Sequence, residues 1–212
     1  MPVSKRVSSL MKPLLAAAVL AAALPGSALG AGLVARDLSP RPSGQAVSTR
    51  VFELVGAHWR GPGHVQFRTR NLAGRWTAWR TFTPEDAGPE RGRESRATRG
   101  WRVASPFWTG PSNGIQYRSE GHVAKLRAYF VRSPRERRPV KRVDLAGAPA
   151  IIPRSGWGAN ESVRRGAPYY ADSIRFAVVH HTAGSNSYTK AQSALIVRAI
   201  ELYHVKGNGW ND

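Results

Sequence analysis

The chain has 212 residues, of which 42% are hydrophobic and none is cysteine. This length accommodates one large domain or two small ones, and the apolar content excludes a chain that is disordered throughout. The absence of cysteine excludes a fold held together by disulfide bonds. A formal net charge of +19 predicts an affinity for polyanions.

Residues 1–30 predict a secretory signal peptide. Three basic residues precede an Ala/Leu run over 14–24, which is too short to span a bilayer stably. A Pro-Gly break and a small-x-small site at 28–30 predict cleavage before Ala31, with an uncleaved membrane anchor as the alternative. Cleavage would lower the net charge to +16, since the segment holds three basic residues and no acid. We therefore expect a secreted protein without a mature membrane span.

The next part of the chain predicts an all-β, sandwich-like domain. Residues 31–50 are weakly patterned and rich in turn formers, which predicts a flexible lead-in. From 51 to 131, apolar and polar residues alternate between Gly-containing turns, as strands require. The run Val-Gln-Phe-Arg-Thr at 65–69 resembles Ile-Gln-Tyr-Arg-Ser at 115–119, through either two related β units or chance.

Five tryptophans fall within this β-rich stretch. We expect most of them to lie in the core, with stacking on sugar rings as the alternative. They are Trp59, Trp76, Trp79, Trp101 and Trp108.

A linker and a second domain are predicted after the β-rich stretch. Residues 132–150 begin with six basic residues and two prolines within 132–142, which predicts an extended, basic spacer. From 151 onwards we expect an α/β domain, with a buried strand over 174–180. Thr189 and Gln192 then form a capping box, and an apolar stripe follows at helical spacing. We expect this helix to end near Lys206, where Gly207 stops it.

Two adjacent histidines, His180 and His181, end the predicted strand. Neighbouring side chains on a strand point to opposite faces, so both rings cannot bind one metal ion without distorting the backbone. One of them can be a ligand while the other serves a different role. A histidine at a strand end can also be a purely structural hydrogen-bonding residue.

Three segments of 151–212 together resemble the peptidoglycan recognition protein family, also called type 2 N-acetylmuramoyl-L-alanine amidases. The first is Arg-Ser-Gly-Trp-Gly at 154–158, which marks the start of the domain in that family. The second is His-His-Thr-Ala-Gly at 180–184. The third is Tyr-His at 203–204, followed by Gly-Trp-Asn-Asp at 209–212.

The resemblance implies a zinc hydrolase that cleaves the amide between N-acetylmuramic acid and L-alanine in peptidoglycan. It implies that His180 is a Zn²⁺ ligand and that His181 and Thr182 line the groove for the peptide. It also places His204 at the groove, although a histidine at a helix C-terminus can instead interact with the helix dipole. Trp157 and Trp210 are expected to be packing residues.

The resemblance also implies that the amidase domain is incomplete. The family's other two zinc ligands and its catalytic tyrosine would lie beyond Asp212, so no catalytic residue is expected within 151–212. The predicted fold class is therefore an incomplete α/β amidase domain preceded by an all-β sandwich-like domain. The upstream histidines, at 58, 64 and 122, are not expected to join the site.

Two other functions compete with the amidase. A non-catalytic peptidoglycan-binding protein of the same fold is the main alternative, because some family members retain the groove and lose metal ligands. A nucleic-acid-binding protein would also explain the positive charge. The predicted signal peptide and the lack of a nucleic-acid motif favour the anionic, peptidoglycan-containing cell wall as the partner and argue against nucleic acid.

Overall fold

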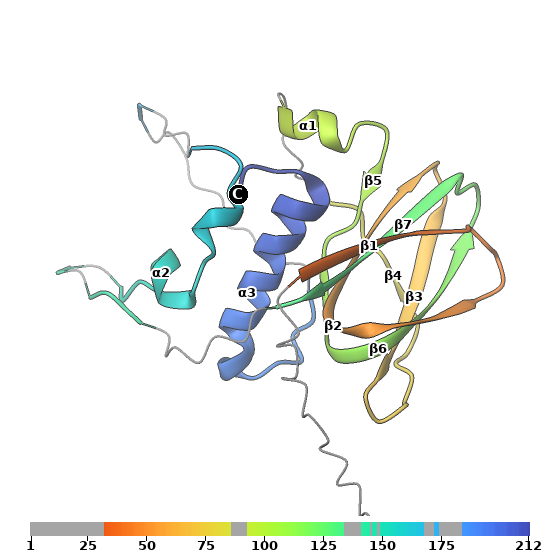
Figure 1. Ribbon diagram of the computed structural model, residues 1–212, viewed down its shortest axis with the longest axis horizontal. Coiled ribbons are helices and arrows are strands. Elements are labelled where there is room, and N and C mark those ends of the chain that lie inside the picture. Colours follow the sequence, from red (N-terminus) through yellow and green to blue (C-terminus); the bar gives the residue numbers. More distant parts are fainter. Residues whose placement is uncertain are drawn as a thin grey trace, which may run out of the picture.

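The computed structural model describes residues 32–85, 93–133, 141–144, 146–147, 149–167, 172–173 and 184–212. A curved antiparallel sheet forms one side of the molecule, and a helical segment lies against it (Figure 1). Among the described residues, no helix is both long and apolar enough to cross a bilayer.

The sheet begins earlier in the chain than the sequence pattern predicts. Its strands, as far as the structure describes the chain, are β1 (Gly32–Leu38), β2 (Gln45–Arg60), β3 (His64–Asn71), β4 (Arg80–Thr81), β5 (Arg102–Val103), β6 (Phe107–Glu120) and β7 (Lys125–Arg132). Their order is β1-β7-β2-β6-β3-β4, and β5 pairs with β2. The expected flexible lead-in over 31–50 is therefore wrong. Most of it is strand, because β1 pairs with β7 along its whole length.

The sheet folds over on itself at β2. This strand joins one half of the sheet, which contains β1 and β7, to the other half, which contains β6, β3 and β4. The C-terminal half of β2 pairs with β7, from Leu54 to Arg60, whereas its N-terminal half pairs with β6, from Gln45 to Ser48. Register shifts lie between these halves, as β-bulges at a bend require. In β6, Gly110 has a φ of 66°, a left-handed value that favours glycine. The result is a sandwich-like antiparallel β structure.

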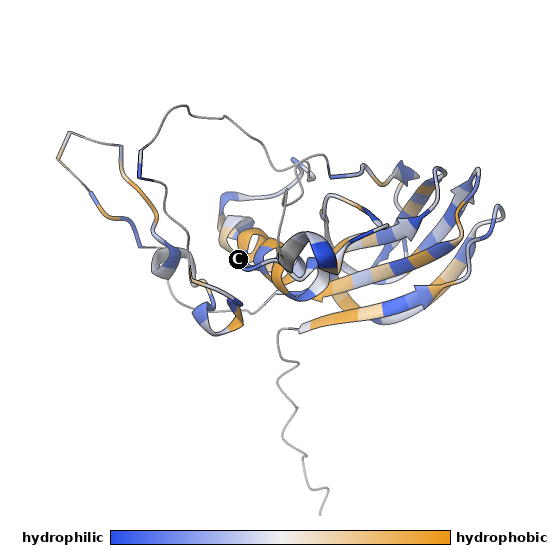
Figure 2. Cartoon of the chain, turned by 90° about the horizontal axis from the view of Figure 1, so that it is seen from above, coloured by the Kyte–Doolittle hydropathy of each residue, from blue (hydrophilic) through white to orange (hydrophobic). Residues whose placement is uncertain are grey.

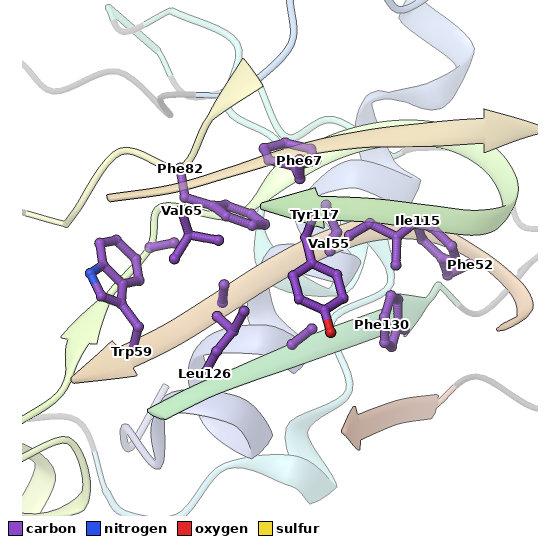
Figure 3. Close-up of a cluster of buried hydrophobic side chains, with 13 residues drawn as sticks. Phe52, Val55, Trp59, Val65, Phe67, Phe82, Ile115, Tyr117, Leu126 and Phe130 are labelled. Atoms are coloured by element: carbon purple, nitrogen blue, oxygen red, sulfur yellow. The ribbon is translucent and has the colours of Figure 1, made fainter. Parts of the chain in front are cut away.

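The main core lies between the two halves of the folded sheet. Figure 3 shows aromatic and aliphatic side chains of β2, β3, β6 and β7 gathered in this space. Phe67 stacks on Phe82 with ring centroids 4.1 Å apart, and Phe52 meets Phe130 edge-on at 5.1 Å. Hydropathy alternates along the strands, as this one-sided burial requires (Figure 2).

The tryptophans are divided between core and surface. Trp59 and Trp108 are buried, as expected. The other three, Trp76, Trp79 and Trp101, are half-buried, and arginine side chains lie over their rings. The expectation that most of the five lie in the core is therefore wrong.

The helical segment packs on the outer face of the sheet and forms a second core. The described helices are α1 (Arg93–Ala97), α2 (Arg154–Trp157), η1 (Glu161–Val163), η2 (Lys190–Gln192), α3 (Ser193–Leu202) and η3 (Tyr203–Asn208). Ala199, Leu202 and Tyr203 pack against Leu54, Trp108, Tyr129 and Val131. Residues 52–59 of β2 are consequently buried on both faces.

The ends of the long helical segment match the sequence in part. The predicted capping box is confirmed, because Thr189 and Gln192 bond reciprocally at the start of η2. The helix does not stop at Gly207, however. It widens into the π-helical turn η3 and ends at Gly209, whose φ of 78° is left-handed.

The described part of 151–212 is helical. Ile151 forms one isolated bridge with Val143 of the predicted linker. The strand expected over 174–180 lies outside the described residues, so the α/β amidase domain stays a prediction. The described structure as a whole is an antiparallel β domain with few helices.

Candidate functional site

The structure describes one of the four predicted site residues. His180, His181 and Thr182 lie outside the described residues, whereas His204 lies in η3. Gly184, which ends the predicted His-His-Thr-Ala-Gly motif, lies beside Pro106 at the start of β6. A small cavity of about 90 Å³ opens here, with Gly184, Trp108 and Ile196 in its wall.

His204 faces the sheet domain and Trp210. Its ring centroid is 4.5 Å from that of Trp210, and its Nε2 is 3.6 Å from a carboxylate oxygen of Glu85. Its backbone carbonyl accepts the N–H of Trp210 at 3.1 Å, which closes the end of η3. His204 thus joins the last residues of the chain to the sheet. Its place in the last turn of the helical segment is where a histidine can interact with the helix dipole, and its role in the peptide groove stays a prediction.

Buried polar atoms gather around this histidine. His204 Nε2, Trp210 Nε1 and one oxygen of Glu85 have no hydrogen-bond partner among the described residues. Buried polar groups are normally hydrogen-bonded, so three such atoms around one side chain mark His204 as a candidate site.

The segment predicted to begin the second domain, at Arg154, is bonded to helix α3. Arg154 of α2 donates hydrogen bonds to Glu201 of α3 at 3.0 Å and to Glu161 at 2.7 Å. It also lies 2.9 Å from a carboxylate oxygen of Asp212. A second link joins the Arg198 side chain of α3 to the backbone carbonyl of Trp157. Two of the three motif segments, 154–158 and the one that ends at Asp212, therefore meet beside α3.

A buried polar seam fastens this helical unit to the sheet. His58 Nε2 lies 2.9 Å from Asn208 Oδ1, and the Tyr129 hydroxyl lies 3.1 Å from His58 Nδ1. The Tyr203 hydroxyl donates to the carbonyl of Ala104 at 2.8 Å. Since the amide oxygen can only accept, Nε2 of His58 carries the proton and Nδ1 accepts from Tyr129.

Burial sets the charge states along this polar seam. It lowers the pKa of His58 to about 4, because the cationic imidazole would lose its hydration. It also raises the pKa of Tyr129 and raises that of Tyr203 well above its usual value. All three groups are therefore neutral near pH 7, as a hydrogen-bonded interior requires.

The polar seam includes a residue that the sequence did not connect with the site. His58 was expected to remain apart from it, and it contacts none of the predicted site residues that the structure describes. It does bind Asn208, four residues after His204. Nothing in the local pattern of β2 signals this pairing, because its partners lie 71 and 150 positions further along the chain.

The comparisons with known proteins divide the chain between two relationships. A family model described as "Rv3811 N-terminal galactose-binding domain-like" matches residues 15–143, which is more than half of the chain. The chain belongs to this family. The matched range contains every strand described above. Residues 151–212 lie outside it.

The second relationship is to the peptidoglycan-recognition proteins of Drosophila. The chain is 33% identical over 63 residues to peptidoglycan-recognition protein LE of Drosophila melanogaster, covering 30% of this chain and 18% of that protein. It is 36% identical over 62 residues to protein SC2 of the same species, covering 29% of this chain and 33% of the relative. It is 31% identical over 65 residues to protein SC1a/b of Drosophila simulans, covering 29% of this chain and 32% of that protein.

This second relationship is distant and partial. The chain spans at most a third of the length of these relatives. The aligned segments are about as long as residues 151–212, which carry the motifs described above. A relationship to peptidoglycan-recognition proteins is therefore supported, at the level of a shared segment.

Proposed function

We propose that this protein binds peptidoglycan through residues 151–212. The observation that carries the proposal is the similarity to proteins named for peptidoglycan recognition. The contacts of Arg154 with Asp212 and with Glu201 of α3 support it, because Arg154 and Asp212 come from two of the segments that resemble the family. In this proposal His204, His181 and Thr182 contact the peptide of the cell wall. The polymer meets the molecule on the side where α3 and the chain terminus lie.

We further propose that the complete protein is an N-acetylmuramoyl-L-alanine amidase. The described residues do not fit a zinc site, since they contain no group of three or more His, Cys, Asp or Glu side chains that could hold a metal ion. His180 is the proposed ligand within the sequence, and two more ligands would have to come from outside the described residues. Zinc bound there would supply an activated water for amide hydrolysis.

The proposed compartment is the cell exterior, with the protein associated with the cell wall. The net charge of +19 supports this location, because the wall is the nearest polyanion for an exported protein. The predicted signal peptide lies within residues 1–31, outside the described part of the chain. Amino-terminal sequencing of the secreted protein tests it, with Ala31 expected as the first residue.

A sedimentation assay with purified peptidoglycan sacculi tests the binding proposal. The wild-type chain is expected to sediment with sacculi, and His204→Ala is expected to weaken this binding. His64→Ala is the matched control, because His64 is exposed on β3, in the β domain. Sacculi that retain neither the wild type nor the control protein would contradict the proposal.

A cleavage assay separates the amidase from its alternative. In the complete protein, an amidase would release new α-amino groups of L-alanine, and His180→Ala would abolish both this release and zinc binding. The alternative is a non-catalytic peptidoglycan-binding protein, which would bind sacculi and release no amines. This alternative is retained because the described residues contain no complete metal site.

A further inference from the structure

The outer face of β3 and β6 carries a ladder of alternating arginine and tryptophan side chains. Its members, in spatial order, are Arg118, Trp79, Arg68, Trp76 and Arg70. The centroid of the Trp79 ring lies 4.5 Å from the guanidinium carbon of Arg118 and 5.0 Å from that of Arg68. The centroid of the Trp76 ring lies 5.3 Å from the guanidinium carbon of Arg68 and 5.7 Å from that of Arg70. All four distances fall within the range of cation–π interactions. We call this surface the Arg–Trp ladder.

The sequence echo between 65–69 and 115–119 produces this ladder. The two segments are antiparallel neighbours, with Phe67 opposite Tyr117, so the echo becomes a local two-fold pattern. Arg118 consequently stands opposite Gln66, and Arg68 stands opposite Gln116. The echo does not mark two β units that pack face to face.

Amide side chains fix the guanidinium groups in place. The Nε of Arg118 donates to Gln66 Oε1, and the Nε of Arg68 donates to Gln116 Oε1, both at 2.7 Å. The Nε of Arg70 donates to an amide oxygen of Asn113 at 3.1 Å. These bonds orient each planar group through one nitrogen and leave its two Nη atoms without a protein acceptor among the described residues.

The charge on this face is not neutralised within the protein. Arg68, Arg70 and Arg118 form no ion pair with a carboxylate in the part of the chain that the structure describes. Arg118 and Arg68 occupy diagonal positions on adjacent strands, which are roughly 7–8 Å apart, and Arg70 follows Arg68 on the same face of β3, so like charges lie close together along the ladder. An array of oriented guanidinium groups is suited to phosphate oxygens, which can accept two parallel N–H bonds from each.

We propose that the Arg–Trp ladder binds a phosphodiester-bearing glycan polymer of the cell wall, as a binding surface additional to the peptidoglycan segment. The choice of a wall polymer over nucleic acid rests on the proposed function. The line of three guanidinium groups matches a polymer with repeating anionic groups better than a single small anion. The half-buried indoles hold the guanidinium planes in position on the exposed sheet face.

Matched charge variants test the ladder in the full chain. The ladder variant carries Arg68→Gln, Arg70→Gln and Arg118→Gln. The control variant carries Arg50→Gln, Arg99→Gln and Arg142→Gln, which remove the same charge from exposed positions outside the ladder. Binding is measured on three probes: cell walls that carry phosphodiester polymers, the same walls after hydrofluoric acid extraction of those polymers, and double-stranded DNA.

We expect the ladder variant to bind intact walls at least about tenfold more weakly than the control variant, since charge-assisted hydrogen bonds to several phosphates are lost. Both variants should bind extracted walls equally, and the difference on intact walls should shrink as salt is added. A variant that carries only Arg68→Lys should bind intact walls more weakly than the wild type, because lysine keeps the charge but lacks the planar guanidinium group. Unchanged thermal unfolding of the ladder variant would show that it remains folded.

Equal binding of the ladder and control variants to intact walls would overturn the inference. A loss confined to DNA would assign the ladder to nucleic acid and would overturn it as well. The extracted walls report on the peptidoglycan proposal separately. If no protein binds them, that proposal fails, while the comparison on intact walls still decides the role of the ladder.

Discussion

Gly56 of β2 provides the space in which Tyr203 docks, and adding one methyl group there tests how the helical unit is held. A Cβ atom at this position would lie 2.7 Å from the Tyr203 hydroxyl oxygen and closer still to two ring carbons. Ordinary carbon contacts are about 3.5–4.0 Å, so the ring would have to move by about 1 Å or more. It cannot do so easily, because it is fully buried and bonded to the carbonyl of Ala104.

The expected cost of Gly56→Ala follows from these contacts. Overpacking a well-packed site costs about 1–3 kcal/mol. Displacing the hydroxyl would leave the carbonyl of Ala104 unpaired, which adds about 1–3 kcal/mol. We therefore expect a loss of roughly 2–6 kcal/mol in the free energy of unfolding, or release of residues 193–212 from the sheet. Thermal denaturation measures the first outcome, and limited proteolysis followed by mass spectrometry detects the second.

Two further variants make this prediction refutable. Tyr203→Ala should be destabilising alone, yet adding Gly56→Ala to it should cost little, because the clash is gone. Gly74→Ala is the control, since no atom lies within 4 Å of its added methyl and only its φ of 78° opposes the change, at about 1–2 kcal/mol. If Gly56→Ala were as stable as the wild type and equally resistant to protease, the docking of Tyr203 on β2 would be refuted.

The remaining predictions concern the polar seam, Arg154 and the capping box at the start of η2. His58 has a folded pKa of about 4, below its usual 6.5, so the unfolded state takes up a proton first as pH falls. Stability should therefore be full above about pH 6.5 and decline by about 3 kcal/mol towards pH 4, and His58→Gln should lack this decline in denaturant titrations. Arg154→Gln should cost about 1–3 kcal/mol, because Glu201 is a buried carboxylate that loses its cation; an unchanged melting temperature would contradict this. Thr189→Ala should cost about 1 kcal/mol through loss of the capping box, measured as lower stability against the exposed-site control Ser187→Ala.

Sequence patterns predicted the elements whose signals lie within a few residues of one another. The alternation over 65–70 and 126–130 predicted strands there, and β3 and β7 confirm it. The capping box at Thr189 was predicted because both of its bonds join residues three positions apart. The end of the helix was misplaced, because a π-helical turn carries it past Gly207 to Gly209. That turn places Asn208 against His58, a tertiary contact that no local signal contains.

The strands between 31 and 50 were missed for a similar reason. β1 holds three consecutive apolar residues, Leu33 to Ala35, followed by the adjacent charged pair Arg36 and Asp37, so it lacks the alternation of a half-buried strand and its signal is weak. Its pairing with β7 stabilises it as a strand, including an ion pair between Asp37 and Arg127 across the edge. The Arg–Trp ladder had a visible signal, the repeated Gln-x-Arg pattern. Only the antiparallel pairing of the two copies turned that signal into a surface.

The amino-acid sequence alone determined the strand and helix propensities, the positive charge and the motif segments that resemble peptidoglycan-recognition proteins. Each of these depends on composition or on residues a few positions apart. Only the tertiary structure decided that the sheet folds over on itself, that Gly56 receives Tyr203, and that His58 and Asn208 meet. These contacts join residues far apart in the chain, and the free energy of burial that selects them exists only once both partners are in place.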